Sequence, residues 1–185
     1  MILSQRKYLE KVLESFGMSS SKSVVTPLAS HFKLSCSQYP RTDEEKGEMT
    51  KVPYVNVIGC MMYAKEHWKA VKWVLRYLKD TQWYGLVYGK SAGNDARLCG
   101  YVDSDFAGDL DRRRSLTGYL FFLDGCLINW KASLQYVVAL STTEVKYIAA
   151  TEAVRESLWL RGLIAELGIN WRLLKFIVTA QVQFT

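Results

Sequence analysis

An Asp-Gly pair between two apolar runs constrains the fold of this chain more than any other feature. Asp124-Gly125 joins residues 115–123 to residues 126–130, and such a pair is the strongest short signal for a two-residue β-hairpin. A third, β-branched run at residues 136–140 is expected to add another strand. Since consecutive strands usually pair, the sequence predicts three antiparallel strands in a row.

A long helix is predicted directly after these strands, over residues 142–167. Ser141 and Glu144 fit a capping box, in which a hydroxyl caps the helix and a glutamate follows three residues later. Gly168 is expected to end the helix. Its predicted apolar face consists of Val145, Ile148, Ala149, Ala153, Leu160, Leu163, Ile164 and Leu167. With a further strand at residues 175–178, this succession indicates an α/β (α+β) fold on a mixed sheet.

The first eighty residues have a mainly helical character. The spacing of apolar residues predicts a helix over residues 4–17, with Ser4 as its cap and Gly17 as its end. Residues 18–52 are rich in serine and mixed in charge, which is typical of a long, exposed connection. Residues 65–80 form the clearest amphipathic pattern in the chain.

One stripe of that amphipathic helix is cationic. At helical spacing it carries Lys65, Lys69, Lys72, Arg76 and Lys79. Such a row can follow the phosphates of a nucleic acid. The more common alternative is a solvated face whose lysine stems cover apolar surface. The spacing alone leaves both readings open.

Composition excludes several classes of protein. Apolar residues make up 49% of the chain, enough to exclude disorder for most of it. No run approaches the ~18 apolar residues of a membrane span, and residues 1–7 lack the apolar segment of a signal peptide. We therefore expect an intracellular protein, cytoplasmic or nuclear, without membrane contact. The four cysteines and two histidines do not cluster, which argues against zinc. A net charge of +6 keeps nucleic acid open as a partner.

Carboxylates gather at residues 101–109, where a predicted strand at residues 98–103 runs into a glycine turn. Oxygen ligands of this kind suit Mg²⁺, and paired Mg²⁺ ions catalyse phosphodiester hydrolysis. A two-metal site needs three or four carboxylates from separate elements, and this cluster lies on a single turn. Without further ligands, a solubilising loop is the more common interpretation.

Several motifs occur along the chain in an informative order. They are LSQRKY (3–8), VTPL (25–28), VPY (52–54), KEHWKAVKWVLRYLK (65–79), GYVDSDFAG (100–108), DRRRSLTGY (111–119) and ALSTTE (139–144). In this order they resemble the C-terminal part of the Pol polyprotein of copia-type retrotransposons, including the Tnt-like elements of plants. The resemblance covers residues 1 to about 170.

The resemblance implies two parts. Residues 1–82 would be the C-terminal remnant of a reverse transcriptase, and residues 83–185 an incomplete ribonuclease H-like domain with a mixed sheet and a long helix. Domains of this family cut the RNA strand of RNA–DNA hybrids with two Mg²⁺ ions held by carboxylates. Asp103 matches the first of these carboxylates, which makes it the candidate catalytic residue and metal ligand.

The sequence departs from the family at the other ligand positions. Lys146 occupies the position that matches the glutamate of the long helix, and a charged lysine has no lone pair for a metal. Residues 176–181 read FIVTAQ where the family has a Cys-Asp pair, and Asp124 is the only aspartate after Asp111. The family's last acidic segment is also expected to be missing. We therefore expect no bound Mg²⁺ here, although the ancestral family uses it.

The polymerase part also departs from the family. The chain has no adjacent Asp-Asp pair, which polymerase chemistry needs, and a family segment is expected to be deleted near residues 64/65. The favoured hypothesis is a degenerate, catalytically inactive Pol fragment. One alternative is a non-enzymatic binder of RNA–DNA hybrids. A further alternative is a nuclease completed by acids from a partner chain. The candidate nucleic-acid contacts are Arg112, Arg113, Arg114, Lys69, Lys72 and Arg76.

Overall fold

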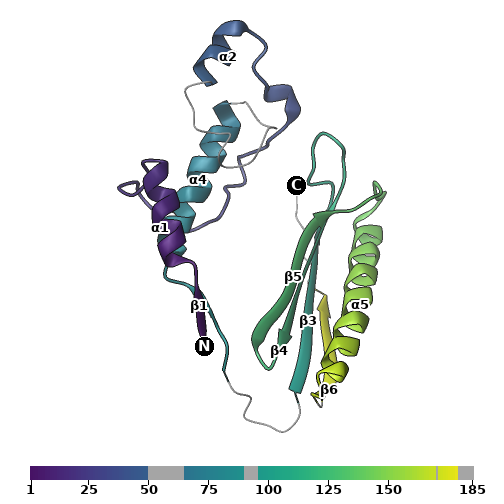
Figure 1. Ribbon diagram of the computed structural model, residues 1–185. Helices are drawn as coiled ribbons and strands as arrows, with labels where there is room; N and C mark the ends of the chain where they lie inside the picture. Colours follow the sequence, from purple (N-terminus) through teal and green to yellow (C-terminus); the bar gives the residue numbers. More distant parts are fainter. Residues whose placement is uncertain (50–64, 90–95, 170, 179–185) are drawn as a thin grey trace. The chain divides into compact units, whose positions relative to one another are not determined.

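The structure, a computed structural model, describes residues 1–49, 65–89, 96–169 and 171–178 (Figure 1). The chain divides into two compact units. The first contains residues 2–85, and the second contains residues 86–185 together with Met1. The predicted deletion near residues 64/65 lies outside the described residues.

The first unit is mainly helical. Its elements are strand β1 (Ile2–Ser4), helix α1 (Arg6–Ser15), the short 3-10 helix η1 (Cys36–Gln38), helix α2 (Asp43–Met49) and helix α4 (Lys65–Thr81). A short strand, β2 (Gly85–Val87), begins at its last residue. The core lies where α1 packs on α4 and buries Leu13, Val71 and Leu75.

One local prediction for this unit needs correction, and another is refined. Helix α1 begins at Arg6 with Gln5 as its N-cap, and no side chain caps it. Ser4 belongs to strand β1 instead, and its hydroxyl only accepts a 3.3 Å hydrogen bond from the Arg6 N–H. The predicted connection at residues 18–52 contains two short helices, η1 and α2, because Ser35 and Thr42 each accept a hydrogen bond from an N–H of the turn that follows.

The second unit is a four-stranded mixed sheet with one long helix (Figure 1). Its elements are strands β3 (Ala96–Asp105), β4 (Leu116–Leu123) and β5 (Cys126–Leu134), helix α5 (Thr142–Glu166) and strand β6 (Trp171–Val178). The spatial order is β5-β4-β3-β6. Strand β4 pairs antiparallel with β3 and β5, whereas β6 pairs parallel with β3, because α5 carries the chain back across the sheet.

The hairpin that the Asp-Gly pair predicts is present. Asp124 and Gly125 both have positive φ angles, 50° and 77°, as a primed two-residue turn requires. The first register pair beyond the turn joins Leu123 to Cys126.

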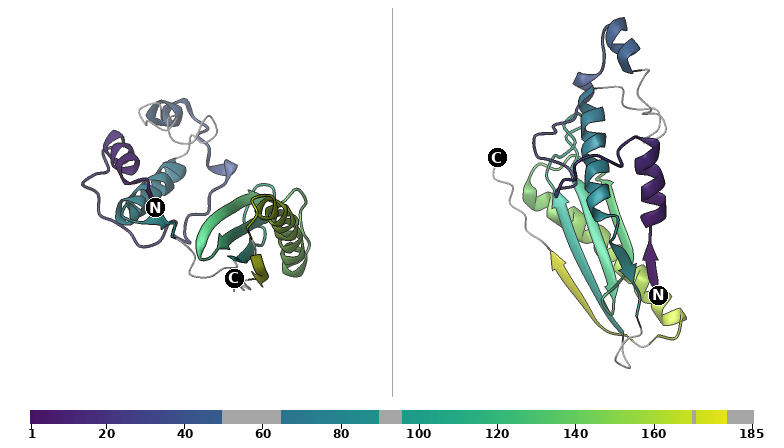
Figure 2. Two further views of the ribbon diagram at one scale, coloured as in Figure 1. Left: turned by 60° about the horizontal axis from the view of Figure 1, so that its bottom comes forward. Right: turned by 90° about the vertical axis from the view of Figure 1, so that its left-hand side faces the viewer.

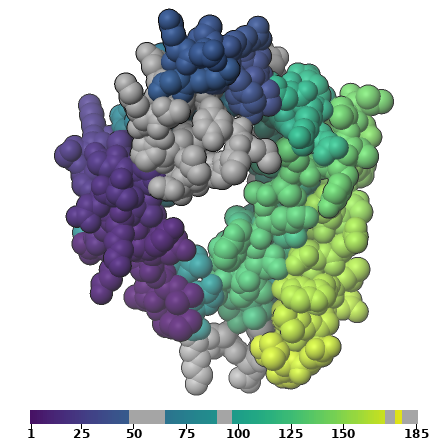
Figure 3. Space-filling view, turned by 45° about the horizontal axis from the view of Figure 1, so that its top comes forward, coloured from purple at the N-terminus to yellow at the C-terminus, as the bar shows by residue number. Residues whose placement is uncertain are grey.

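Helix α5 covers one face of the sheet, and the other views show the helix on the same face (Figure 2). The core between them includes Leu98, Val102, Phe121, Ala153 and Leu160, each at most 3% exposed. In the space-filling view α5 lies directly against the sheet (Figure 3). The fold class predicted from the sequence, a ribonuclease H-like mixed sheet with a long helix, is confirmed.

Other predictions for the second unit are wrong. Residues 136–140 form no strand, and Tyr136 and Leu140 are 88% and 89% exposed. The β4–β5 ladder stops at Leu134, and the following residue, Gln135, turns its side chain into the core. Leu163 and Leu167 lie off the buried face of α5, at 38% and 66% exposure.

Across the described ranges, none of the helices combines the length and the apolar character that crossing a bilayer requires.

Candidate functional site

Asp103 lies near the end of β3, opposite Gly118 of β4. Its side chain is exposed, and one carboxylate oxygen accepts a 2.9 Å hydrogen bond from the N–H of Ser104. Asp105 follows on the same strand and is partly buried. Burial raises the pKa of the Asp105 carboxyl, and the negative charge of Asp103 raises it further. The two carboxylates therefore lie near each other.

A tight turn follows β3 and carries the arginine run. The Asp109 carboxylate accepts hydrogen bonds from the backbone N–H groups of Asp111 and Arg112, at 3.0 and 3.1 Å. The Arg113 N–H donates to the carbonyl of Asp109 at 2.8 Å, and Arg113 has a φ of 56°. Arg112 and Arg113 are exposed, whereas Arg114 is partly buried. The turn thus holds two adjacent guanidinium groups in solvent on an ordered backbone.

Gly108 is needed within this turn. A Cβ added to it would overlap the carboxylate of Asp105. The glycine therefore lets the chain pass close to Asp105 at the end of β3.

Lys146 lies in the first turns of α5 and is partly buried. The N-terminus of this helix is capped as predicted, because the Ser141 hydroxyl accepts a 3.1 Å hydrogen bond from the Glu144 N–H. The Glu144 carboxylate accepts a 2.7 Å hydrogen bond from the N–H of Leu140, one residue earlier than a capping box would place it. Glu144 therefore has a structural role at the helix start.

Sequence reasoning missed Gln135, which fixes the start of α5 to the sheet. The side chain is fully buried, and its Nε2 donates to Thr117 Oγ1 at 3.0 Å and to the Val145 carbonyl at 3.1 Å. The backbone N–H of Gln135 bonds the Ser115 carbonyl at 2.9 Å. These contacts set the position of the helix turn that carries Lys146. A polar residue at the end of an alternating strand pattern was the available signal.

Sequence reasoning also missed a polar cluster between α5 and the sheet. Asn129 donates a 2.8 Å hydrogen bond to Glu156, and Lys131 pairs with Glu152 at 3.3 Å. Burial raises the pKa of Tyr119 to about 12, with further contributions from the charge of Glu156 and a hydrogen bond to it. The cluster joins two strands to one face of the helix.

The residues present do not fit a two-metal site. Within residues 1–49, 65–89, 96–169 and 171–178, no group of three or more His, Cys, Asp or Glu side chains could hold a metal ion. That Lys146 puts a positive charge at the position of the family's carboxylate stays a prediction from the resemblance. The expected substitution of the Cys-Asp pair is only partly described, since residues 179–181 lie outside the described residues.

The cationic row of α4 binds to its own chain in several places. Lys69 pairs with Glu66 at 2.6 Å. Arg76 donates to the Lys22 carbonyl and Lys79 to the Ser21 carbonyl, each at 2.6 Å. Lys72 Nζ lies 6.0 Å from the centroid of the Trp68 ring. The row therefore holds the connection against α4, and its contact with phosphates stays a prediction.

Comparison with known proteins gives several extended matches. The chain is 49% identical to the Retrovirus-related Pol polyprotein from transposon TNT 1-94 of Nicotiana tabacum, over 91% of this chain and 14% of the polyprotein. It is 34% identical to the Retrovirus-related Pol polyprotein from transposon RE2 of Arabidopsis thaliana, over 91% of this chain and 12% of that protein.

A shorter relative is covered over most of its length. An uncharacterized mitochondrial protein of Arabidopsis thaliana is 32% identical, over 86% of this chain and 72% of that protein. No protein-family profile and no solved structure matches the chain.

Proposed function

Because the chain belongs to the family of copia-type retrotransposon Pol polyproteins, we propose that it is a Pol segment without ribonuclease H activity. Residues 1–82 would derive from the end of the reverse transcriptase, and residues 83–185 from the ribonuclease H-like domain. The chain spans only 14% of the tobacco polyprotein, so the activities of whole Pol proteins are not transferred to it.

The observation that carries this proposal is Lys146 on α5. A ribonuclease H of this family needs a carboxylate there to share metal ions with the first-strand aspartate. A lysine in its place repels Mg²⁺ and donates no lone pair. Asp103 lies on β3, with Asp105 two residues later. These two carboxylates on one strand cannot clamp both the attacking and the leaving oxygen.

The test is an assay for cleavage of a labelled RNA–DNA hybrid by the purified chain in Mg²⁺. We expect no cleavage above the buffer control. Cleavage that Asp103→Asn abolishes would overturn the proposal, because it would show a working centre built on Asp103. Cleavage that Asp103→Asn leaves unchanged would indicate a contaminating nuclease.

A second candidate function, binding of RNA–DNA hybrids without cleavage, is favoured by the ordered turn at residues 109–114. Ribonuclease H folds contact hybrids largely through backbone phosphates, and these contacts need no metal. Arg112 and Arg113 are the exposed cations of this turn.

This second candidate is tested by hybrid binding at ~50 mM salt, where phosphate contacts are strongest. We expect Arg112→Gln with Arg113→Gln to weaken binding and to reduce the salt dependence. Arg155→Gln, which removes an exposed charge from α5, is the matched control and should have a smaller effect. Absence of hybrid binding by the wild-type chain would contradict the hypothesis.

A further inference from the structure

Within residues 96–169 and 171–178, no helix of the second unit covers one of the two faces of its sheet. Helix α5 lies on the opposite face, where Leu98, Val102 and Phe121 are buried (Figure 2). Because side chains alternate along a strand, the odd-numbered residues of β3, from Arg97 to Asp105, point away from α5. We call this side of the sheet the open face.

A row of large apolar side chains crosses the whole open face. Register pairs join Leu120 of β4 to Trp130 of β5 and to Tyr101 of β3. Tyr101 pairs in turn with Ile177 of β6. Tyr101, Leu120 and Trp130 are 39%, 41% and 61% exposed. The ring of Phe122 widens this apolar row, because it meets the Tyr101 ring edge-on with the centroids 5.7 Å apart. A continuous apolar surface of this kind marks an interaction site.

Charged residues of opposite sign lie on the two sides of the apolar row. Asp103 and Asp105 lie at the end of β3. Arg97 lies near the start of β3, and Lys175 of β6 pairs in register with Cys99. Arg97, Asp103 and Lys175 are exposed. The open face therefore has a cationic end, an apolar centre and an acidic end.

This charge pattern is complementary to itself. In a face-to-face pair with a twofold axis along the apolar row, each strand lies over the same strand of the second copy and runs in the opposite direction. The cationic end of one copy then meets the acidic end of the other, and the apolar row meets its own counterpart. A twofold axis along the strands would instead place like charges together, which disfavours that pairing. The charges therefore select one arrangement of two copies.

We propose that the open face binds a second copy of this chain in this antiparallel arrangement. The apolar row supplies the aromatic centre of the interface, and the charged ends form its polar rim. Since the face has only four strands, the interface is small, and we expect weak association with a Kd on the order of 10 μM. The surface needs no metal, so it is independent of the proposed loss of nuclease activity.

The test is sedimentation velocity of the full chain from about 1 to about 200 μM, at ~50 mM salt, where charges are screened least. We expect an equilibrium between monomer and dimer. Trp130→Ser should raise the dimer Kd about tenfold or more, because it removes an aromatic side chain from the apolar row. Trp159→Ser is the matched control, since it removes a tryptophan of similar exposure, 58%, from α5 and should leave the Kd unchanged.

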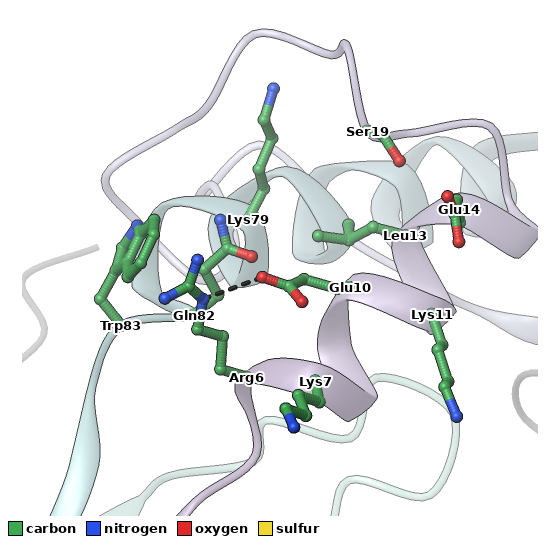
Figure 4. A pocket seen from close by; sticks show the side chains of 10 residues that line it. All are labelled: Arg6, Lys7, Glu10, Lys11, Leu13, Glu14, Ser19, Lys79, Gln82 and Trp83. Carbon is green, nitrogen blue, oxygen red and sulfur yellow. Dashed lines mark hydrogen bonds and ion pairs between the residues drawn. The ribbon is translucent and has the colours of Figure 1, made fainter.

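A second control lies in the first unit. Trp83 is 63% exposed and lines a cavity of about 610 Å³, where the Arg6 guanidinium lies 3.6 Å from its ring centroid (Figure 4). Trp83→Ser should leave the dimer Kd unchanged. Equal increases in the Kd of Trp83→Ser and Trp130→Ser would overturn the proposal, because association would then follow exposed aromatic residues in general.

The antiparallel orientation is tested by exchanging charges. Lys175→Glu and Asp103→Lys should each raise the dimer Kd, because each places like charges across the interface. The variant with both substitutions restores opposite charges and should bind within about threefold of the wild type. Tighter association of both single variants would overturn the antiparallel arrangement, since it would show that like ends meet.

Three further outcomes would overturn the proposal. A wild-type chain that stays monomeric over the whole range would show that this face binds no second copy. Species larger than a dimer would contradict a twofold pair, which is closed. A Trp130→Ser variant that associates as the wild type does would place the interface elsewhere. Circular dichroism melts establish that each variant is folded, and Tyr101→Ser, from the same row, replaces Trp130→Ser if that variant does not fold.

Discussion

At the scale of single residues, packing of the sheet requires a residue without a side chain at Gly100. Gly100 lies in the middle of β3, between β4 and β6, where the rings of Phe121 and Phe176 meet over it. A Cβ on Gly100 would lie 2.7 Å from Cε1 of Phe121 and 3.2 Å from Cδ1 of Phe176. Phe121 is fully buried, so its ring has no free space into which it can move.

We therefore predict that Gly100→Ala lowers the free energy of unfolding of the second unit by about 1–3 kcal/mol, through overpacking. Urea denaturation followed by far-UV circular dichroism measures this. Gly118→Ala is the matched control, because the nearest atoms to its added Cβ lie 3.9 and 4.0 Å away. Equal decreases in the free energy of unfolding of both variants would show that glycine is required for the flexibility of the strand, and not because a Cβ has no room.

The second prediction at this scale concerns the contribution of Gln135 to stability. Gln135→Met keeps the length and approximate volume of the side chain but removes the donor to Thr117 and Val145. The buried Thr117 hydroxyl then loses this hydrogen-bond partner, which should cost about 1–3 kcal/mol in the free energy of unfolding. Gln5→Ala, an exposed N-cap without a side-chain bond, should change it by less than about 0.5 kcal/mol. A Gln135→Met variant with the same free energy of unfolding as the wild type would show that Gln135 does not hold the start of α5.

At the scale of elements, sequence patterns predicted the helices and strands better than the contacts between them. The Asp-Gly turn and the Ser141 cap identified the hairpin and the start of α5, since both signals act within a few residues. The strand predicted at residues 136–140 was wrong. β-branched residues favour a strand only when a neighbouring strand is available to pair with, and the β4–β5 ladder ends at Leu134. No local pattern could predict that Glu156 of α5 would meet Tyr119 and Asn129.

The contact between Tyr119 and Glu156 makes stability depend on pH at the alkaline end. Tyr119 titrates near 10 in the unfolded chain and at about 12 in the folded chain. The folded state therefore holds this proton more tightly, so its stabilisation is complete below pH 10 and is lost as the pH rises toward 12. Near neutral pH, Tyr119→Phe should be less stable than wild type by about 1.5–3 kcal/mol, for a lost hydrogen bond to a charged group.

We predict that this difference narrows between pH 10 and pH 12. Urea denaturation of the wild type and Tyr119→Phe at matched pH values measures it. Tyr147→Phe removes the hydroxyl of a residue that is 72% exposed and should follow the wild type throughout. A difference in the free energy of unfolding between wild type and Tyr119→Phe that stays constant from pH 10 to pH 12 would contradict the contact between Tyr119 and Glu156.

At the scale of the whole molecule, the sheet order β5-β4-β3-β6 follows from three antiparallel strands and one return through α5, which places β6 parallel to β3. Composition and periodicity predicted a mixed sheet, and the acidic run at residues 101–109 already drew attention to Asp103. Lys146 emerged only from the resemblance to Pol, because a metal site depends on residues that are more than forty positions apart in the chain. If Lys146 does stand at the family's glutamate position, as we propose, that exchange also contributes to the net charge of +6.

Substitution at Lys146 gives the last prediction, which concerns the metal-binding capacity of the whole fold. Addition of Mg²⁺ should leave the melting temperature of the wild type unchanged, because a ligand stabilises a fold only when it binds the native state.

Lys146→Glu would add a carboxylate at residue 146 of α5. Together with Asp103, it would give the family's metal position two carboxylates. If Mg²⁺ then binds at a concentration ten times its Kd, the variant gains about 1.4 kcal/mol. Lys146→Gln, which removes the cation without adding a ligand, should show no gain, and adding Asp103→Asn to Lys146→Glu should remove it. A Lys146→Glu variant that melts identically with and without Mg²⁺ would place Lys146 outside the metal position, and the proposed loss of nuclease activity would then need another cause.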